Sequence, residues 1–360
     1  MKIVVSPSFA DSVCDLRVRK IKSVFFQQVN RLIDWSAITK IINKHYTKGQ
    51  NAVGQSAYDG LLLFKMCLLQ TWYGLSDYEV EDRINDSISF GYFCGLTLEQ
   101  PAPDHSTLSR FRSALTKSET FEKLFKEINK QLEAHGIIVK TGAIIDASVI
   151  DTPRKPKGKA SYIIPEDRAE EADSNAESIA PIRMPNPQKP ERQLSAGVDK
   201  EASWIKKGGK LRYGYKKHHV TNLDGLVLGV VSTSARVHEI SNLEEVVASA
   251  DLPERIPLKG DKGFKSKKND EILKRRKLKN HILKKAVKGK PLTAREQAFN
   301  KAVGKERYKV ERTFGSIRRW FSGGVARYVG LSKMHTQNLM EALCYNLYRS
   351  PGIVMSHSKR

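Results

Sequence analysis

Apolar residues in the first third of the chain recur at intervals of three and four positions. Val24, Val29, Leu32 and Ile33 follow this spacing, and residues 38–42 continue it. Such spacing places apolar side chains on one face of a helix. We therefore predict an all-helical region over residues 20–136, with a helix at 57–73 that ends at Gly74.

Two local signals inside this region mark where helices begin. Ser76 and Glu79 have the spacing of a capping box, which opens a helix. Residues 103–112 predict a turn followed by a short basic helix, and such a helix suits the major groove of DNA. Arg110 and Arg112 on it are candidate DNA contacts, although a solvated helix face would show the same pattern.

The period changes at Gly142, where residues 143–150 form an apolar, β-branched run that predicts a buried strand interrupted by Asp146. Turn chemistry at 222–225 predicts a hairpin of 213–220 with 226–232. The remaining elements are predicted at 241–250 (helix), 255–261 (strand), 267–277 (helix), 279–283 (strand), 294–320 (helix) and 336–348 (helix). This order predicts an α/β fold, a mixed sheet flanked by helices.

Residues 152–197 differ in composition from the segments around them. They are polar and hold seven of the chain's 14 prolines, which predicts a flexible proline-rich insertion. We accordingly expect a helical DNA-binding domain at 20–136 and a catalytic domain at 137–350 that carries this insertion.

The charge of the chain narrows the class of partner. A formal net charge of +23 and a pI near 9.8 imply a broad positive surface field, and nucleic acid is the commonest polyanion that matches it. A protein that is basic only for solubility is the alternative. Charge alone specifies no reaction.

Cysteine usage and hydropathy bear on where the protein works. The four cysteines are widely spaced and form no CxxC pair, which favours a reducing cytoplasm. We find no signal-peptide pattern and no apolar stretch near the ~20 residues that a membrane span needs. We therefore expect a soluble, cytoplasmic protein with no membrane partner.

Three carboxylates have positions that suit metal-dependent chemistry on phosphodiesters. Asp146 interrupts a strand, where an ionised carboxylate needs a cation or hydrogen bonds. Asp261 ends a later strand at a glycine-flanked turn. Glu311 shares a helix face with Arg307 and Arg318, and Asp and Glu oxygens suit paired divalent cations.

Each of these residues also has a plainer interpretation. Glu311 alone is compatible with an i,i+4 ion pair to Arg307 on a solvated helix, and Asp261 with an ordinary turn. His238 and Glu239 could reach the metal site, or could serve as a helix cap or in a salt bridge. We therefore leave His238 and Glu239 out of the predicted catalytic set.

Ordered motifs in the chain resemble the insertion sequence five family of bacterial transposases, a branch of the DDE group with an RNase H-like core. The resemblance is carried by 145–153 (IDASVIDTP), 206–210 (KKGGK), 213–216 (YGYK), 231–239 (VSTSARVHE) and 260–264 (GDKGF). The helical half contributes 70–77 (QTWYGLSD) and 103–107 (PDHST). Gly304 stands where many members have tyrosine, and Arg318 where lysine is usual.

The resemblance implies a transposase that binds terminal inverted repeats, cleaves DNA and joins the freed 3′-hydroxyl to target DNA. Its metal-binding catalytic triad would be Asp146, Asp261 and Glu311, with two Mg²⁺ ions, or Mn²⁺. The partner would be double-stranded DNA, bound by a homodimer. Contacts with DNA are assigned to Arg307, Arg318, Arg110, Arg112, Lys216 and Lys262; Lys262 begins the basic run 262–290.

Two other functions fit the same residues. The first is a protein with this fold that binds specific DNA but has lost catalytic turnover. It would keep the basic surface, but the intact carboxylates argue against this hypothesis. A metal-dependent nuclease without strand transfer shares the first chemical step. Only the reaction products separate these hypotheses.

Overall fold

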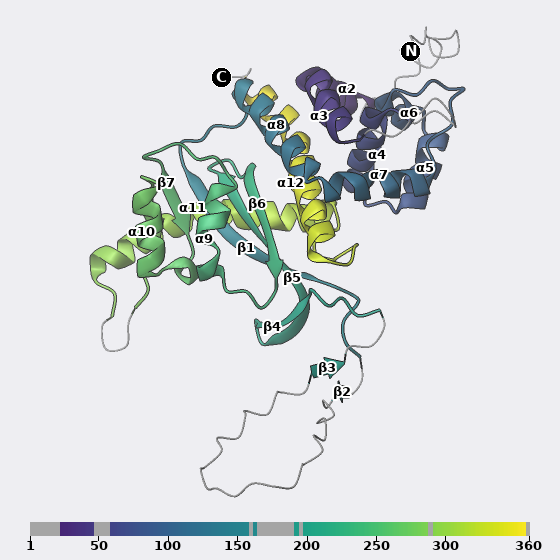
Figure 1. The fold of residues 1–360 in the computed structure, drawn as a ribbon. Coiled ribbons are helices and arrows are strands. Elements are labelled where there is room, and N and C mark those ends of the chain that lie inside the picture. The colour runs from purple at the N-terminus through teal and green to yellow at the C-terminus, as the bar shows by residue number, and fades with distance from the viewer. Residues whose placement is uncertain are drawn as a thin grey trace, which may run out of the picture.

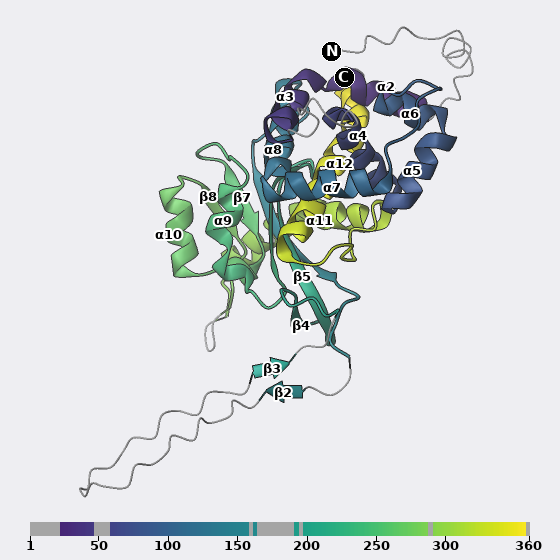
Figure 2. The same ribbon diagram turned by 45° about the vertical axis from the view of Figure 1, so that its right-hand side comes forward.

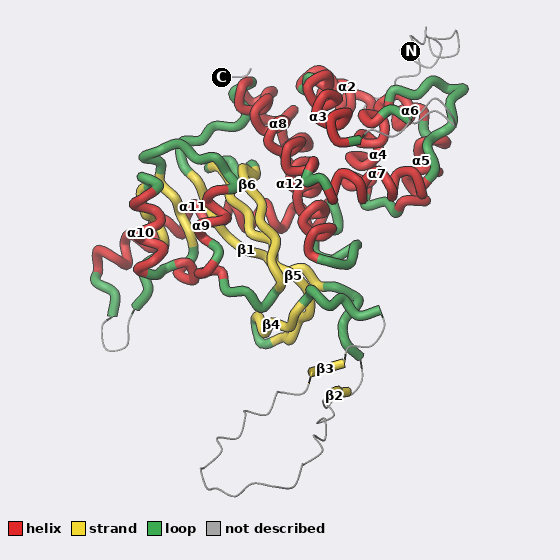
Figure 3. Tube along the Cα trace, in the orientation of Figure 1, coloured by secondary structure: helices red, strands yellow, loops and turns green. Residues whose placement is uncertain are grey.

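The computed structural model describes residues 22–46, 58–157, 161–163, 191–193, 197–286 and 291–357. A mixed sheet flanked by helices occupies one side of the molecule, and a helical region occupies the other (Figure 1). Figure 3 shows the same division by element type. The predicted α/β class with preceding helices is confirmed.

Seven helices in the described residues precede the sheet. They are α2 (Lys22–Leu32), α3 (Trp35–His45), α4 (Gly60–Tyr73), α5 (Asp77–Asp86), α6 (Ile88–Cys94), α7 (His105–Lys117) and α8 (Thr120–Ala134). The predicted stop and start are present: Gly74 is left-handed with φ 68°, and Ser76 and Glu79 form a capping box. Asp104 caps α7 by accepting from the Thr107 amide at 2.9 Å.

Six strands form the main sheet: β1 (Ala143–Asp151), β4 (Ser203–Lys207), β5 (Lys210–Asn222), β6 (Val227–Ser234), β7 (Pro257–Gly260) and β8 (Lys279–Ile282). β5 pairs antiparallel with β1 on one edge and with β4 and β6 on the other. β7 pairs parallel with β1, and β8 parallel with β7. The resulting order β6-β5-β1-β7-β8, with three antiparallel strands followed by two parallel ones, is the RNase H-like arrangement.

The β4–β5 hairpin was not predicted from the sequence as a pair of strands. Gly208 and Gly209 form its two-residue turn with φ of 60° and 76°, a conformation that glycine adopts without strain. The Gly208-Gly209 pair is the sequence signal from which this hairpin could have been predicted. In the proline-rich insertion the structure describes only β2 (Ser161–Ile163), β3 (Glu191–Gln193) and the two ends, so the prediction of flexibility lies mostly outside the described residues.

Alternate residues of β1 face different helices. Ile144 packs with Val310 and Phe314 of α11 (Ala294–Trp320), whereas Ile145 belongs to the large core shared with α9 (Leu243–Ala248). α10 (Lys267–Arg275) lies beside α9 in both ribbon views (Figures 1 and 2). Because both faces of β1 are covered, its apolar run is nearly continuous rather than alternating.

The last helix, α12 (Leu331–His357), connects the sheet to the helical region. It runs along β6 and continues among α4, α7 and α8 (Figure 2). The sequence predicted only residues 336–348, but the helix continues through Pro351. Ser350 is buried within it and Ile353 packs against the core, so packing offsets the hydrogen bond that proline removes.

One hydrophobic core includes residues of both the helical region and the sheet, such as Leu68, Ile145 and Leu343. The Trp72 indole also donates to the Cys344 carbonyl at 3.0 Å. The division into a DNA-binding and a catalytic domain stays a prediction. Among the described residues, no helix is both long and apolar enough to span a membrane.

Candidate active site

Three acidic side chains surround one arginine on the face of the sheet covered by α11. The Arg307 Nη2 atom lies 3.5 Å from Asp146 Oδ2 and 3.8 Å from Glu311 Oε1, and its Nη1 atom lies 3.3 Å from Asp261 Oδ1. The structure therefore brings together all three carboxylates that the sequence singled out. Arg307 is held among them rather than projecting outward, with its side chain 14% exposed.

The fold supplies each carboxylate from a different element. Asp146 lies in the middle of β1, on the same side as Ile144, and therefore faces α11. Asp261 follows the last residue of β7, the strand parallel to β1. Glu311 lies one turn after Arg307 on α11. Gly260 lets β7 pack closely against β1, because a Cβ atom on this residue would lie 2.9 Å from the Ile145 side chain.

Burial perturbs the pKa of Asp146. Desolvation raises its pKa to about 6, a hydrogen bond from the Ala147 amide and the charge of Arg307 oppose the rise, and the negative charge of Glu239 adds to it. The Asp146 side chain is 18% exposed, against 60% for Glu311. A carboxylate at this position is destabilised unless positive charge is supplied.

This shift predicts that Asp146→Asn stabilises the protein in EDTA at pH 8. An acid whose pKa is raised on folding destabilises the folded state above that pKa, and the penalty disappears as the pH falls from about 6 towards 4. We expect the free energy of unfolding to rise on the order of 2 kcal/mol at pH 8. Urea denaturation measures it, with exposed Asp82→Asn as the control; a variant no more stable than wild type at pH 8 would contradict the argument.

Two of the residues assigned to DNA contacts lie beside the carboxylates. The Arg318 Nη2 atom donates to Ser148 Oγ at 3.0 Å, and Ser148 lies two residues beyond Asp146 on β1. Lys262 follows Asp261 directly in η2 (Lys262–Phe264) and is exposed. Arg318 and Lys262 therefore place positive charge beside the carboxylates.

Arg112 and Lys216 are buried, which argues against the predicted contacts with DNA. Arg112 forms a two-pronged ion pair with Asp77, with both N–O distances 2.8 Å, and its guanidinium lies over the Tyr328 ring. Lys216 donates to the Val237 carbonyl at 2.7 Å. Arg110 is exposed on α7 and bonds to Ser106 of its own helix.

The part of the chain that carries the three carboxylates matches a known protein family. Residues 138–347, which include the sheet, α11 and all three carboxylates, match the family described as Transposase DDE domain. The chain belongs to this family. Residues 15–114 match a second family, Transposase domain (DUF772), so the chain is a DNA transposase of the bacterial insertion sequence type; its place in the insertion sequence five branch stays a prediction.

Individual proteins similar to this transposase carry related descriptions. The transposase for insertion sequence element IS1106 of Neisseria meningitidis serogroup B is 31% identical over 243 residues, which cover 67% of this chain and 76% of that protein. A piggyBac transposase synaptic complex with hairpin DNA has a TM-score of 0.42 at 10% identity, covering 95% of this chain and 77% of that one.

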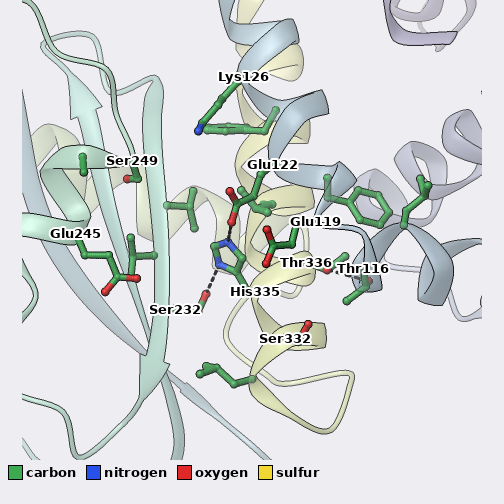
Figure 4. Close-up of a pocket in the computed structure, with 18 of the residues that line it drawn as sticks. Thr116, Glu119, Glu122, Lys126, Ser232, Glu245, Ser249, Ser332, His335 and Thr336 are labelled. Carbon is green, nitrogen blue, oxygen red and sulfur yellow. Dashed lines mark hydrogen bonds and ion pairs between the residues drawn. The ribbon is translucent and has the colours of Figure 1, made fainter. Parts of the chain in front are cut away.

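A cavity of the transposase lies away from the carboxylates. It has a volume of about 690 Å³ and lies between β6, α8, α9 and α12. Figure 4 shows His335 at its centre, bonded to Glu122 and to Ser232, with both distances 3.0 Å. Residues of both the helical region and the sheet line this cavity, and none of the three carboxylates is among them.

The sequence did not indicate that two histidines of β5 are buried. His219 lies directly opposite Asp146 in the β1–β5 register and stacks on Phe314, with ring centroids 4.6 Å apart. Burial lowers the pKa of His219 well below its usual value, and its two ring nitrogens have no partner among the described residues. His219 therefore presents a neutral ring beside the acidic site.

Proposed function

We propose that this transposase binds the terminal inverted repeats of an insertion sequence, cleaves the DNA and joins the freed 3′-hydroxyl to target DNA. In this proposal Asp146, Asp261 and Glu311 hold two divalent cations, Mg²⁺ or Mn²⁺. The observation that carries it is the convergence of these carboxylates, from a strand, a loop and a helix, on the Arg307 guanidinium.

The donor set supports a cation at this place. Among the described residues, no three His, Cys, Asp or Glu side chains form a group that could hold a metal ion, and the three carboxylates are arranged around the Arg307 guanidinium. That guanidinium is a cation, and its buried Nε has no partner. Carboxylate oxygens are also the ligands that Mg²⁺ and Mn²⁺ prefer, so the residues fit the proposed ions.

Basic residues of the protein would position the DNA at the proposed metal site. Paired divalent ions supply activation of the attacking oxygen and stabilisation of the leaving oxygen. Arg307 would pair with a DNA phosphate once cations replace it among the acids. Arg318 and Lys262 would hold the strand on either side, since guanidinium and ammonium groups bind phosphate oxygens.

The test is a cleavage and joining assay with labelled DNA carrying the element's ends, in Mg²⁺ or in EDTA. We expect cleavage and joined products in Mg²⁺ alone. Cleavage without joining would assign a nuclease, and binding without cleavage would assign an inactive DNA-binding protein. The proposed homodimer is checked by light scattering of the protein with and without these DNA ends, where a monomeric complex would contradict it.

The phosphate contacts predict how binding depends on salt. We expect Lys262→Ala to weaken DNA binding several-fold and to lower the slope of log affinity against log salt by about 1, because one fewer cation displaces counterions. Fluorescence anisotropy across a salt series measures both. Lys126→Ala is the matched control, since Lys126 borders the cavity in Figure 4 rather than the carboxylates; equal slopes for the two variants would remove Lys262 from the interface.

A further inference from the structure

Glu239 brings a fourth carboxylate to the acidic site. It begins η1 (Glu239–Ser241), which packs against η2, the turn that follows Asp261. A Cβ atom placed on Gly263 would lie 3.3 Å from Glu239 Oε2 and 3.8 Å from Asp261 Oδ2. The two carboxylates therefore both approach the point at which a side chain on residue 263 would begin.

The charge of Glu239 also acts on the centre of the site. Its negative charge acts electrostatically on Asp146. The three other acids share the Arg307 guanidinium, but no ion pair or hydrogen bond reaches the Glu239 carboxylate within the described part of the chain. Three of the four acidic groups therefore pair directly with one guanidinium, and the fourth, Glu239, does not.

A lysine that acts on the charge of Glu239, Lys216, forms its hydrogen bond with another group. Lys216 interacts electrostatically with Glu239, but its ammonium donates to the Val237 carbonyl at 2.7 Å and is buried. That bond holds the loop that carries Glu239 in place. Lys216 therefore holds the backbone two residues before Glu239 and forms no direct ion pair with its carboxylate.

We propose that Glu239 holds a divalent cation together with Asp261, as a fourth acidic residue of the metal site. This inference rests on the proposed function, because it assumes that the other three acids bind metal. Hard divalent cations take six or more oxygen ligands, so a fourth carboxylate adds a donor and negative charge. Gly263 adds no side chain beside the two acids.

The experiment measures Mn²⁺ binding to the full chain by calorimetric titration and by electron paramagnetic resonance, without DNA. The variants are Glu239→Gln, Asp146→Asn and, as the matched control, Glu245→Gln. Glu245 is exposed on neighbouring α9 and faces the cavity rather than the acidic site (Figure 4). We expect Glu239→Gln to weaken the binding of one Mn²⁺ ion ten- to a hundredfold and Glu245→Gln to match wild type.

Thermal unfolding separates metal binding from a structural role. In EDTA, Glu239→Gln removes one of four converging negative charges, so its unfolding temperature should equal or exceed that of wild type. In Mn²⁺ it should gain less stability than wild type does. If Glu239 instead served the fold, the variant would lose stability in EDTA and bind Mn²⁺ normally, which overturns the proposal.

The outcomes also distinguish this inference from the proposed function. Loss of Mn²⁺ binding in Asp146→Asn with normal binding in Glu239→Gln overturns the role of Glu239 and leaves the three-carboxylate site intact. Normal binding in both variants overturns both proposals. Weakened binding in both, with the control unchanged, supports both.

Discussion

Glu311→Gln is expected to reduce DNA cleavage by about a thousandfold or more while leaving DNA binding near wild type. Metal-held charge stabilisation is worth several kcal/mol in the transition state, and about 4 kcal/mol corresponds to a factor of a thousand in rate. Glutamine keeps the size of the side chain and removes its charge. The Glu311 side chain is 60% exposed, so the substitution leaves the core of α11 untouched.

Single-turnover cleavage in Mg²⁺, with binding measured in parallel by anisotropy, tests this prediction. Glu271→Gln is the control, because Glu271 is exposed on α10 and is not among the carboxylates around Arg307. Cleavage by Glu311→Gln within tenfold of wild type would remove Glu311 from the site. A parallel loss of binding would instead assign it to DNA contact.

The second large effect is expected at the buried ion pair between Lys217 of β5 and Glu341 of α12. Each side chain is 2% exposed, and the Lys217 Nζ to Glu341 Oε2 distance is 2.7 Å. Lys217 also donates to the Gly323 carbonyl, and Glu341 accepts from Gln337. Glu341→Ala would leave a buried ammonium without its counter-ion, which costs about 3–5 kcal/mol of unfolding free energy.

Urea denaturation measures this loss and the partial recovery in a double variant. Lys217→Met with Glu341→Leu removes both charges, and such replacements are often neutral or stabilising, so most of the lost stability should return. Glu254→Ala is the control at an exposed ion pair with Lys277, where we expect less than about 1 kcal/mol. Similar losses for Glu341→Ala and Glu254→Ala would contradict the argument from burial.

Local sequence signals were reliable where short-range chemistry determines structure. The capping box of Ser76 and Glu79, the left-handed Gly74 and the strand around Asp146 are all present. Each depends on residues within a few positions of one another. The extension of α12 through Pro351 was missed because packing against distant helices overrides the local preference of proline.

The candidate site shows the same limit. Residue type and spacing indicated Asp146, Asp261 and Glu311, but their meeting at Arg307 depends on contacts across as many as 161 positions. The roles of the basic residues were less predictable, because the residue type alone does not show whether a side chain is buried or exposed. Arg112 was assigned to DNA, yet the structure places it against Asp77.

The sequence by itself determined most of the order of helices and strands, the net charge of +23 and the acidic residues available for chemistry, because periodicity, turn chemistry and composition act locally. Only the tertiary structure decided which charges meet. It placed one guanidinium among three carboxylates, left the Glu239 carboxylate without a direct ion pair in the described residues, and buried Lys216 and Lys217. Burial and pairing depend on which elements pack together, and short-range patterns carry little of that information.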